Sequence, residues 1–313
     1  MVIPKRNTTL CPASPLTAQA PFLIAQSGAS GHNRRMLNES TDLSRFLFQG
    51  LAGLIVLAGA TADIYLALLV QTRRILPSLP SRTLLTQRPF TAFHAQLALF
   101  ATLMFALPML FQKPPAAAPS DLSLILGPVL YAITGFMVIA LCLTYSRTSF
   151  RQAFLSPLCT SRQALKKGVL YGFAIVPPVV MLSMVITMAT EALGYEPQLQ
   201  EVFDWLGDDS LALSTRAFMV AAAVVIAPVV EEALFRGILF PAVLKARPFF
   251  FAALLSGAYF AIVHFHAPSF LPLLALSIAF SAGYAATGSI LTPIVMHALF
   301  NLTSVIFYLA DRG

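Results

Sequence analysis

The sequence predicts an all-α fold, a polytopic transmembrane bundle of about eight helices. Of its 313 residues 58% are hydrophobic and only 11% are charged, and the mean hydropathy is +0.78. A soluble domain carries about a quarter charged residues, and so much apolar surface cannot be hidden in one soluble core of this size. Strict two-residue alternation, the pattern of a membrane β-barrel, is absent. The composition therefore excludes a soluble enzyme, a nucleic-acid binder and a disordered tail as interpretations of the whole chain.

The first segment, residues 1–44, is predicted to be a flexible polar tail. It is rich in Ser, Thr, Asn, Pro and Ala and has no sustained periodicity. Its one apolar stretch, 22–25, is too short to be the core of a signal peptide. Met36, directly after two arginines, is an alternative translation start, so it stays open whether residues 1–35 belong to the mature protein.

Two further segments carry the predicted membrane helices: 45–165 holds the first three and 166–313 holds the remaining five. Each apolar run approaches or exceeds the roughly 20 residues that cross a ~30 Å hydrocarbon core at 1.5 Å per residue. Seven helices with a re-entrant segment are the alternative. The runs are Phe46–Gln71, Thr91–Gln112, Leu122–Tyr145, Gly168–Leu193, Leu211–Ala246, Phe249–Phe265, Phe270–Gly288 and Ile290–Ala310.

The net charge of +7 has a local explanation. Basic residues gather in alternate loops between the apolar runs, as the positive-inside rule requires for cytoplasmic loops. The pI of 9.6 is therefore no argument for nucleic acid as a partner. The predicted partner is the lipid bilayer, and the predicted location is the cell (plasma or inner) membrane. The basic loop residues include Arg73, Arg74, Arg82, Arg88, Arg147, Arg151, Arg162, Lys166, Lys167, Lys245 and Arg247.

The fifth predicted helix contains three ionisable residues, Glu231, Glu232 and Arg236. Charges near the bilayer centre cost roughly 2.5–3.5 kcal/mol each, so such groups are functional candidates. Glu232 and Arg236 lie about 40° apart on a helix and can form an ion pair, which makes them structural support. Glu231 points to another face without a local counter-ion and is a candidate general base. Pro228, one turn earlier, is expected to kink or widen the helix.

Two later helices bring further polar groups to this neighbourhood. An antiparallel turn near Arg247-Pro248 would bring His264 to the depth of Glu231. His297 and Asn301 are four residues apart and share a helix face. Taken singly, His264 could be an interface residue, and His297 with Asn301 could be an interhelical hydrogen-bond clamp. Together the four groups are hard to explain as packing alone.

Three short patterns in this part of the chain resemble those of a known family. Glu231-Glu232-Ala-Leu-Phe-Arg236 looks like the EExxxR motif of the CPBP family, the CAAX proteases and bacteriocin-processing enzymes. Residues 260–264 fit its FxxxH motif, and residues 297–301 fit its HxxxN motif. The three occur in the expected order, each in an apolar helix. The resemblance covers about Lys166 to Ser304 and makes 166–313 a CPBP-like catalytic core.

This resemblance implies an intramembrane endopeptidase, similar to the Ras-converting CAAX enzymes, that cleaves a peptide or protein substrate at the membrane. Carried over to this chain, Glu231 and His264 would activate a water, and His297 and Asn301 would stabilise the oxyanion. A metal-free site is favoured, because the HExxH arrangement of zinc proteases is absent. The alternative is one zinc on Glu231, His264 and His297, as in metalloproteases.

Two other functions compete with the protease. A catalytically silent scaffold could keep the same fold without turnover. A small transporter would show internal repeats and broken helices around a midplane site. The sequence does not select between a prenylated CAAX terminus, a bacteriocin leader and another membrane protein as the substrate.

Overall fold

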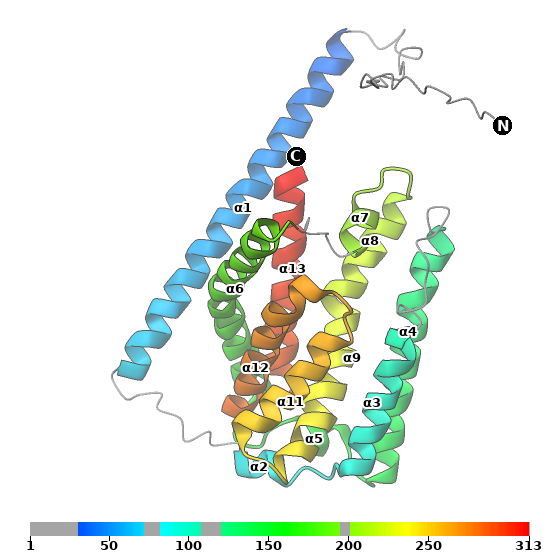
Figure 1. Cartoon of the computed structure of the whole chain (residues 1–313), viewed down its shortest axis with the longest axis vertical. Coiled ribbons are helices and arrows are strands. Elements are labelled where there is room, and N and C mark those ends of the chain that lie inside the picture. The colour runs from blue at the N-terminus through cyan, green and yellow to red at the C-terminus, as the bar shows by residue number, and fades with distance from the viewer. Residues whose placement is uncertain (1–30, 72–81, 108–119, 195–200, 313) are drawn as a thin grey trace, which may run out of the picture. The chain divides into compact units, whose positions relative to one another are not determined.

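The structure is a computed structural model that describes residues 31–71, 82–107, 120–194 and 201–312. In these ranges all regular secondary structure is helical and no strand occurs (Figure 1). The chain from Ser44 onward forms one compact unit. The predicted fold, a polytopic helical bundle, is confirmed.

The helices follow one another in the order shown in Figure 1. From Leu213 to Leu244 the chain is one continuous helical stretch whose turns alternate between α and π geometry. The elements are α1 (Gly31–Gln71), α2 (Arg82–Thr86), α3 (Ala92–Ala106), α4 (Asp121–Tyr145), α5 (Phe150–Phe154), α6 (Ser161–Ala192), α7 (Glu201–Leu206), α8 (Leu213–Ala221), η2 (Ala222–Ile226), α9 (Ala227–Glu232), η3 (Ala233–Leu239), α10 (Phe240–Leu244), α11 (Phe249–Ile262), η4 (Ala267–Ser269), α12 (Phe270–Thr287) and α13 (Leu291–Arg312).

Each predicted apolar run contains a helix, but the helices differ in length. In the described part of the chain, six are long and apolar enough to cross a membrane. The two others, α3 and α11, are shorter apolar helices of 15 and 14 residues. Helix α3 covers only part of its predicted run, whose end lies outside the described residues. The protein is thus an integral multi-pass membrane protein, and its described ranges hold six full-length spans where about eight were predicted.

Helix α1 begins at Gly31, so its first turns lie within the segment predicted to be a tail. No proline follows in the helix to end it, and extending a formed helix costs little compared with nucleating one. Residues 1–30, the rest of that segment, lie outside the described residues.

Helix α13, which carries two of the predicted site residues, is fixed mainly by its packing along α6. A Cβ at Gly168 would approach Val295 Cβ to 2.8 Å, and one at Gly172 would approach Leu299 Cδ1 to 2.9 Å. The two glycines are four apart on α6, the small-residue spacing that lets membrane helices approach closely. The close approach of these helices therefore depends on the missing side chains.

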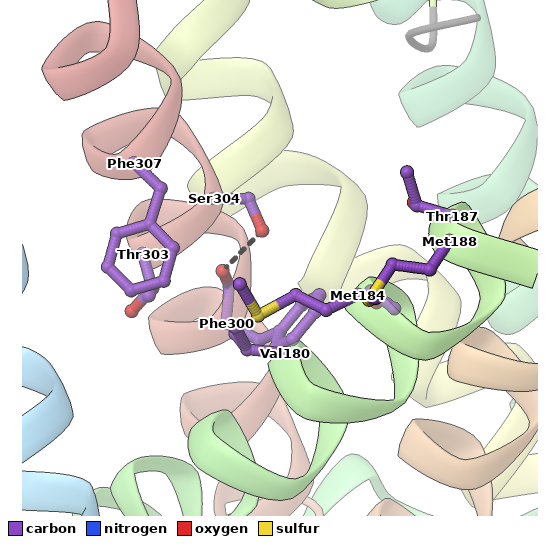
Figure 2. A pocket seen from close by; sticks show the side chains of 9 residues that line it. Val180, Met184, Thr187, Met188, Phe300, Thr303, Ser304 and Phe307 are labelled. Carbon is purple, nitrogen blue, oxygen red and sulfur yellow. Dashed lines mark hydrogen bonds between the residues drawn. The ribbon is translucent and has the colours of Figure 1, made fainter. Parts of the chain in front are cut away.

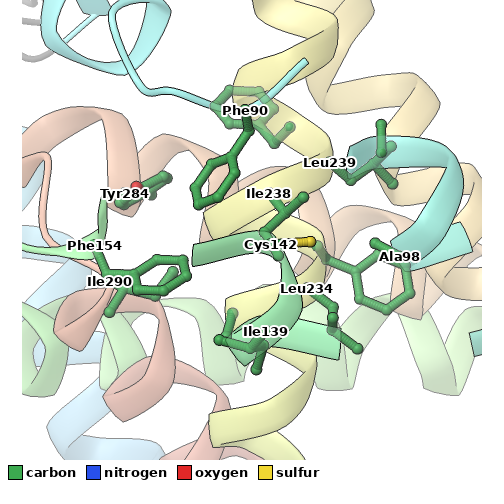
Figure 3. Packing of buried hydrophobic residues seen from close by; sticks show 14 of the residues in the cluster. Phe90, Ala98, Ile139, Cys142, Phe154, Leu234, Ile238, Leu239, Tyr284 and Ile290 are labelled. Carbon is green, nitrogen blue, oxygen red and sulfur yellow. The ribbon is translucent and has the colours of Figure 1, made fainter. Parts of the chain in front are cut away.

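The largest apolar cluster packs residues of several helices and loops together, among them Phe90, Phe154, Ile238 and Ile290 (Figure 3). Two cations tie the loop around Phe90 to this cluster. Lys245 Nζ donates to Phe90 O at 2.7 Å. Arg88, only 3% exposed, donates to the carbonyls of Gln152, Leu155 (2.9 Å) and Gly288 (2.7 Å). Gly288 ends α12 with a positive φ, so Arg88 holds the turn from which α13 starts.

Candidate active site

The helix that carries Glu231 is widened before the motif, as Pro228 predicted. Residues 222–226 form a π-helical turn in which Ala227 N–H donates to Ala222 O. The next donor in that register would be Pro228, which has no N–H. The carbonyl of Ala223 accepts a hydrogen bond from Asn301 Nδ2 of α13 instead, at 2.7 Å. Asn301 therefore makes the interhelical clamp that was its structural alternative. Its amide retains a second N–H.

The predicted ion pair between Glu232 and Arg236 is present and fully buried. Arg236 Nη1 lies 2.8 Å from Glu232 Oε1, and both side chains are 0% exposed. Nη2 donates to Ser277 O at 3.2 Å and to the hydroxyl of the same residue. The guanidinium carbon also lies 4.8 Å and 5.2 Å from the ring centroids of Phe260 and Phe280. Helices α11 and α12 thus hold this cation from two sides.

His297 of α13 connects this buried pair to Glu231. Its Nδ1 lies 2.9 Å from Glu232 Oε1. Because that oxygen belongs to a carboxylate already paired with Arg236, Nδ1–H is the donor. The other ring nitrogen, Nε2, lies 3.9 Å from Glu231 Oε2. The ring stacks on Phe280 at 5.1 Å between centroids, so its orientation is fixed by packing as well as by hydrogen bonding.

Glu231 has one oxygen available for chemistry. Its side chain is 15% exposed, and Oε2 is buried without a hydrogen-bond partner among the described residues. Tyr131, from α4, lies near this carboxylate. The two glutamates therefore differ as predicted: Glu232 is held by a cation, and Glu231 faces polar groups from other helices.

His264 lies just beyond the end of α11. Its Nδ1 is 2.6 Å from Phe260 O, and since a carbonyl only accepts, Nδ1–H is the donor. In the neutral ring Nε2 then carries the lone pair and can accept a proton. The Phe260 ring contacts both imidazoles, with centroids 4.7 Å from His264 and 5.8 Å from His297. The structure therefore brings His264 and His297 to the same aromatic ring and His297 close to Glu231.

The side chains as arranged do not fit the zinc alternative. In the described ranges, no three His, Cys, Asp or Glu side chains gather closely enough to hold a metal ion. This includes the set Glu231, His264 and His297.

An open cavity of about 410 Å³ lies elsewhere, between α6 and α13 (Figure 2). Val180, Met184, Met188 and Phe300 give it an apolar lining. The hydroxyl of Ser304 is turned back to Phe300 O, 3.0 Å away. None of the predicted site residues lines this cavity, so we do not assign it to the reaction.

Sequence reasoning missed two side chains that touch the site. Ser277, on α12, binds Arg236, and Tyr131, on α4, lies near Glu231. A single serine or tyrosine in an apolar helix gives no periodic or spacing signal. Both partners are distant in sequence, so only the packing of the helices brings them to the motif.

Comparison with known proteins finds matches to the segment that carries the predicted site residues. Residues 213–303 match the family described as Type II CAAX prenyl endopeptidase Rce1-like. A Bacillus subtilis (strain 168) protein named "Putative membrane peptidase YdiL" is 36% identical over 91 residues. That stretch is 29% of this chain and 37% of the relative, so the likeness spans little more than a third of that protein. No solved structure matches the chain. The matched residues include both glutamates, Arg236, both histidines and Asn301 of the predicted site.

Proposed function

We propose that this chain, which belongs through residues 213–303 to the CPBP family of CAAX prenyl endopeptidases, is an intramembrane endopeptidase. It would hydrolyse a peptide bond of a membrane-associated substrate, such as a CAAX-type terminus or a leader peptide. The observation that carries this proposal is the approach of Glu231 to His297, 3.9 Å apart, inside an apolar bundle. Ionisable groups are costly there and are retained mainly for function.

The proposed reaction begins with a water between Glu231 and His264. As the water oxygen attacks the scissile carbonyl carbon, its proton passes to the base, and the carbonyl oxygen becomes an oxyanion. The base then gives the proton to the leaving amine nitrogen as the C–N bond breaks. Glu231 is suited to the role of base because Oε2 accepts no hydrogen bond from the residues that the structure describes. His264 is suited to assist because Nδ1 is used by Phe260 O and Nε2 is free to accept.

His297 and Asn301 are the proposed oxyanion donors. His297 Nδ1–H is already given to Glu232, so donation from Nε2 requires the doubly protonated ring. Asn301 uses one N–H on Ala223 O and would donate the other. Donors fixed in this way need no reorganisation when charge develops on the substrate, which is the main source of oxyanion stabilisation in known enzymes.

Cleavage by the purified protein tests this function. The probe is a quenched fluorescent peptide with a farnesylated CAAX end, and a second peptide carries a leader sequence, both in phosphatidylcholine–phosphatidylglycerol vesicles. We expect cleavage of at least one by the native chain and none by Glu231→Gln, because the amide keeps the volume but cannot act as a base. Glu191→Gln is the matched control, since Glu191 is exposed near the end of α6. No cleavage of either peptide by the native chain, or full activity of Glu231→Gln, would contradict the proposal.

The same assay addresses the metal. We expect a chelator to leave turnover unchanged and elemental analysis to find no stoichiometric zinc. Loss of activity on chelation, restored by about one zinc per chain, would establish the metalloprotease alternative instead.

A further inference from the structure

Helix α11 ends directly before His264, and the way it ends decides which group binds its last carbonyls. The N–H of Val263 still donates to Tyr259 O at 3.1 Å, which is the spacing of an α-helix. The next N–H, that of His264, donates to Ala261 O at 3.4 Å instead of to Phe260 O. The carbonyl of Phe260 has thus lost its helical donor, as the last carbonyls of a helix do.

The imidazole of His264 takes the place of that donor. Its Nδ1–H donates to Phe260 O at 2.6 Å. Histidine side chains near a helix C-terminus satisfy free carbonyls in this way. In the neutral ring this bond selects the tautomer with the proton on Nδ1, so Nε2 keeps the lone pair that the proposed reaction uses. The carbonyl is open to the ring because the backbone N–H has left it.

Phe265 is the residue that turns the chain out of the helix. Its φ is +48°, in the left-handed region, where residues other than glycine are uncommon. Among the described residues other than glycine, only Arg147, just beyond the end of α4, also has a positive φ. A left-handed residue past the last turn is a common way to end a helix, and glycine is its usual occupant. Here an aromatic residue, 36% exposed, adopts that conformation.

We propose that Phe265 is a positioning residue for His264: its left-handed backbone ends α11 and leaves Phe260 O to the imidazole. Phe265 belongs to none of the three motifs. If the helix continued through residue 265, the N–H of His264 would return to that carbonyl and the ring would lose its acceptor. A base that is displaced or in the other tautomer loses much of its effect on the rate. This inference rests on the proposed function, because it concerns a residue of the same site.

Two substitutions at this position separate the backbone from the ring. Phe265→Gly and Phe265→Ile both remove the phenyl group, but glycine adopts a positive φ freely and a β-branched residue does not. In the vesicle assay above we expect kcat within about threefold of native for Phe265→Gly. For Phe265→Ile we expect kcat to fall by at least about tenfold with KM within a few-fold, because a small displacement of a reacting group has effects of this size. Equal kcat in the two variants would overturn the proposal.

Arg147 offers a matched control for the backbone change. It is exposed, its φ is +49°, and it too follows a helix end. Arg147→Gly and Arg147→Ile therefore make the same exchange away from the predicted site residues. We expect each isoleucine variant to unfold at a lower temperature than its glycine counterpart, whereas kcat of the folded fraction should fall only at position 265. An equal fall of kcat at both positions would show a general effect of strain and contradict a positioning role.

Nuclear magnetic resonance of the imidazole nitrogens tests the tautomer without relying on turnover or on the folding of Phe265→Ile. In protein with isotope-labelled histidine, the His264 signals are those that His264→Gln lacks. At a pH where the ring is neutral, they should show a protonated Nδ1 and an unprotonated Nε2, both in the native chain and in Phe265→Gly. A proton on Nε2 in the native chain would refute the proposal. An active Glu231→Gln would instead remove the proposed function and leave these spectra unchanged, so the two failures are distinguishable.

Discussion

In the described part of the chain two arginines, Arg88 and Arg236, are almost completely buried, and their guanidinium groups bind different kinds of partner. Arg236 pairs with a carboxylate, Glu232, inside a membrane-spanning helix, and that carboxylate also binds His297. Arg88 lies in the loop before α3, and it donates to the backbone carbonyls of Gln152, Leu155 and Gly288.

The difference separates a cation buried beside the proposed catalytic residues from one that binds loop carbonyls. Arg88 is oriented by carbonyls that lie just beyond the ends of α5 and α12. Among the described residues, no carboxylate accepts a hydrogen bond from it. Arg236, in contrast, holds Glu232 in the position from which it orients His297. Disturbing Arg236 or its partner should therefore affect turnover, and disturbing Arg88 should affect mainly folding.

The largest effect is expected from Glu232→Gln. The substitution leaves Arg236 charged, fully buried and without a counter-ion, which costs about 3–5 kcal/mol of folding stability when a buried pair is broken. Turnover should fall as well, because His297 loses its charged acceptor. Denaturant unfolding in detergent and the cleavage assay measure both, with Glu191→Gln as the control. Native stability in Glu232→Gln would mean that Arg236 does not depend on this partner.

Asn301→Ala comes next and concerns turnover more than stability. If its second N–H stabilises the oxyanion, turnover should fall by about 10²–10³-fold with KM within a few-fold. Loss of the bond to Ala223 O should cost about 1 kcal/mol of stability in addition. Asn301→Asp should be at least as damaging, because it adds repulsion. Normal turnover in correctly folded molecules would leave Asn301 as a clamp alone.

Arg88→Met should have the smallest effect on the reaction. Its charged hydrogen bonds to the carbonyls of Leu155 and Gly288 are lost, so we expect stability to fall by about 2 kcal/mol. Turnover of the folded fraction should stay within a few-fold of native. Unfolding curves and kinetics on the same preparations measure this. A selective loss of turnover at native stability would show that Arg88 acts on the site rather than on the fold.

The residue pairs predicted to share a helix face do so in the structure, because helical periodicity fixes the direction of side chains four residues apart. Glu232 and Arg236 are one turn apart and do form an ion pair, and His297 and Asn301 both project from α13 toward the helix of Glu231. The roles of Glu231, His264, His297 and Asn301 stay predictions that the kinetics above address. The sequence predicts Arg88 as a loop cation, and nothing in the sequence signals its burial.

The sequence alone determined the helices, their approximate spans and the faces on which the motif residues lie. The physical reason is that a bilayer offers the backbone no hydrogen-bond partners, so long apolar runs must be helical and their 3.6-residue period sets the faces. Only the tertiary structure decided which groups meet across helices: His297 with Glu231, Ser277 with Arg236, and Asn301 with the carbonyl that Pro228 leaves unpaired. Those contacts depend on how closely helices approach, as at Gly135 and Val230, and packing of that kind has no period along the chain.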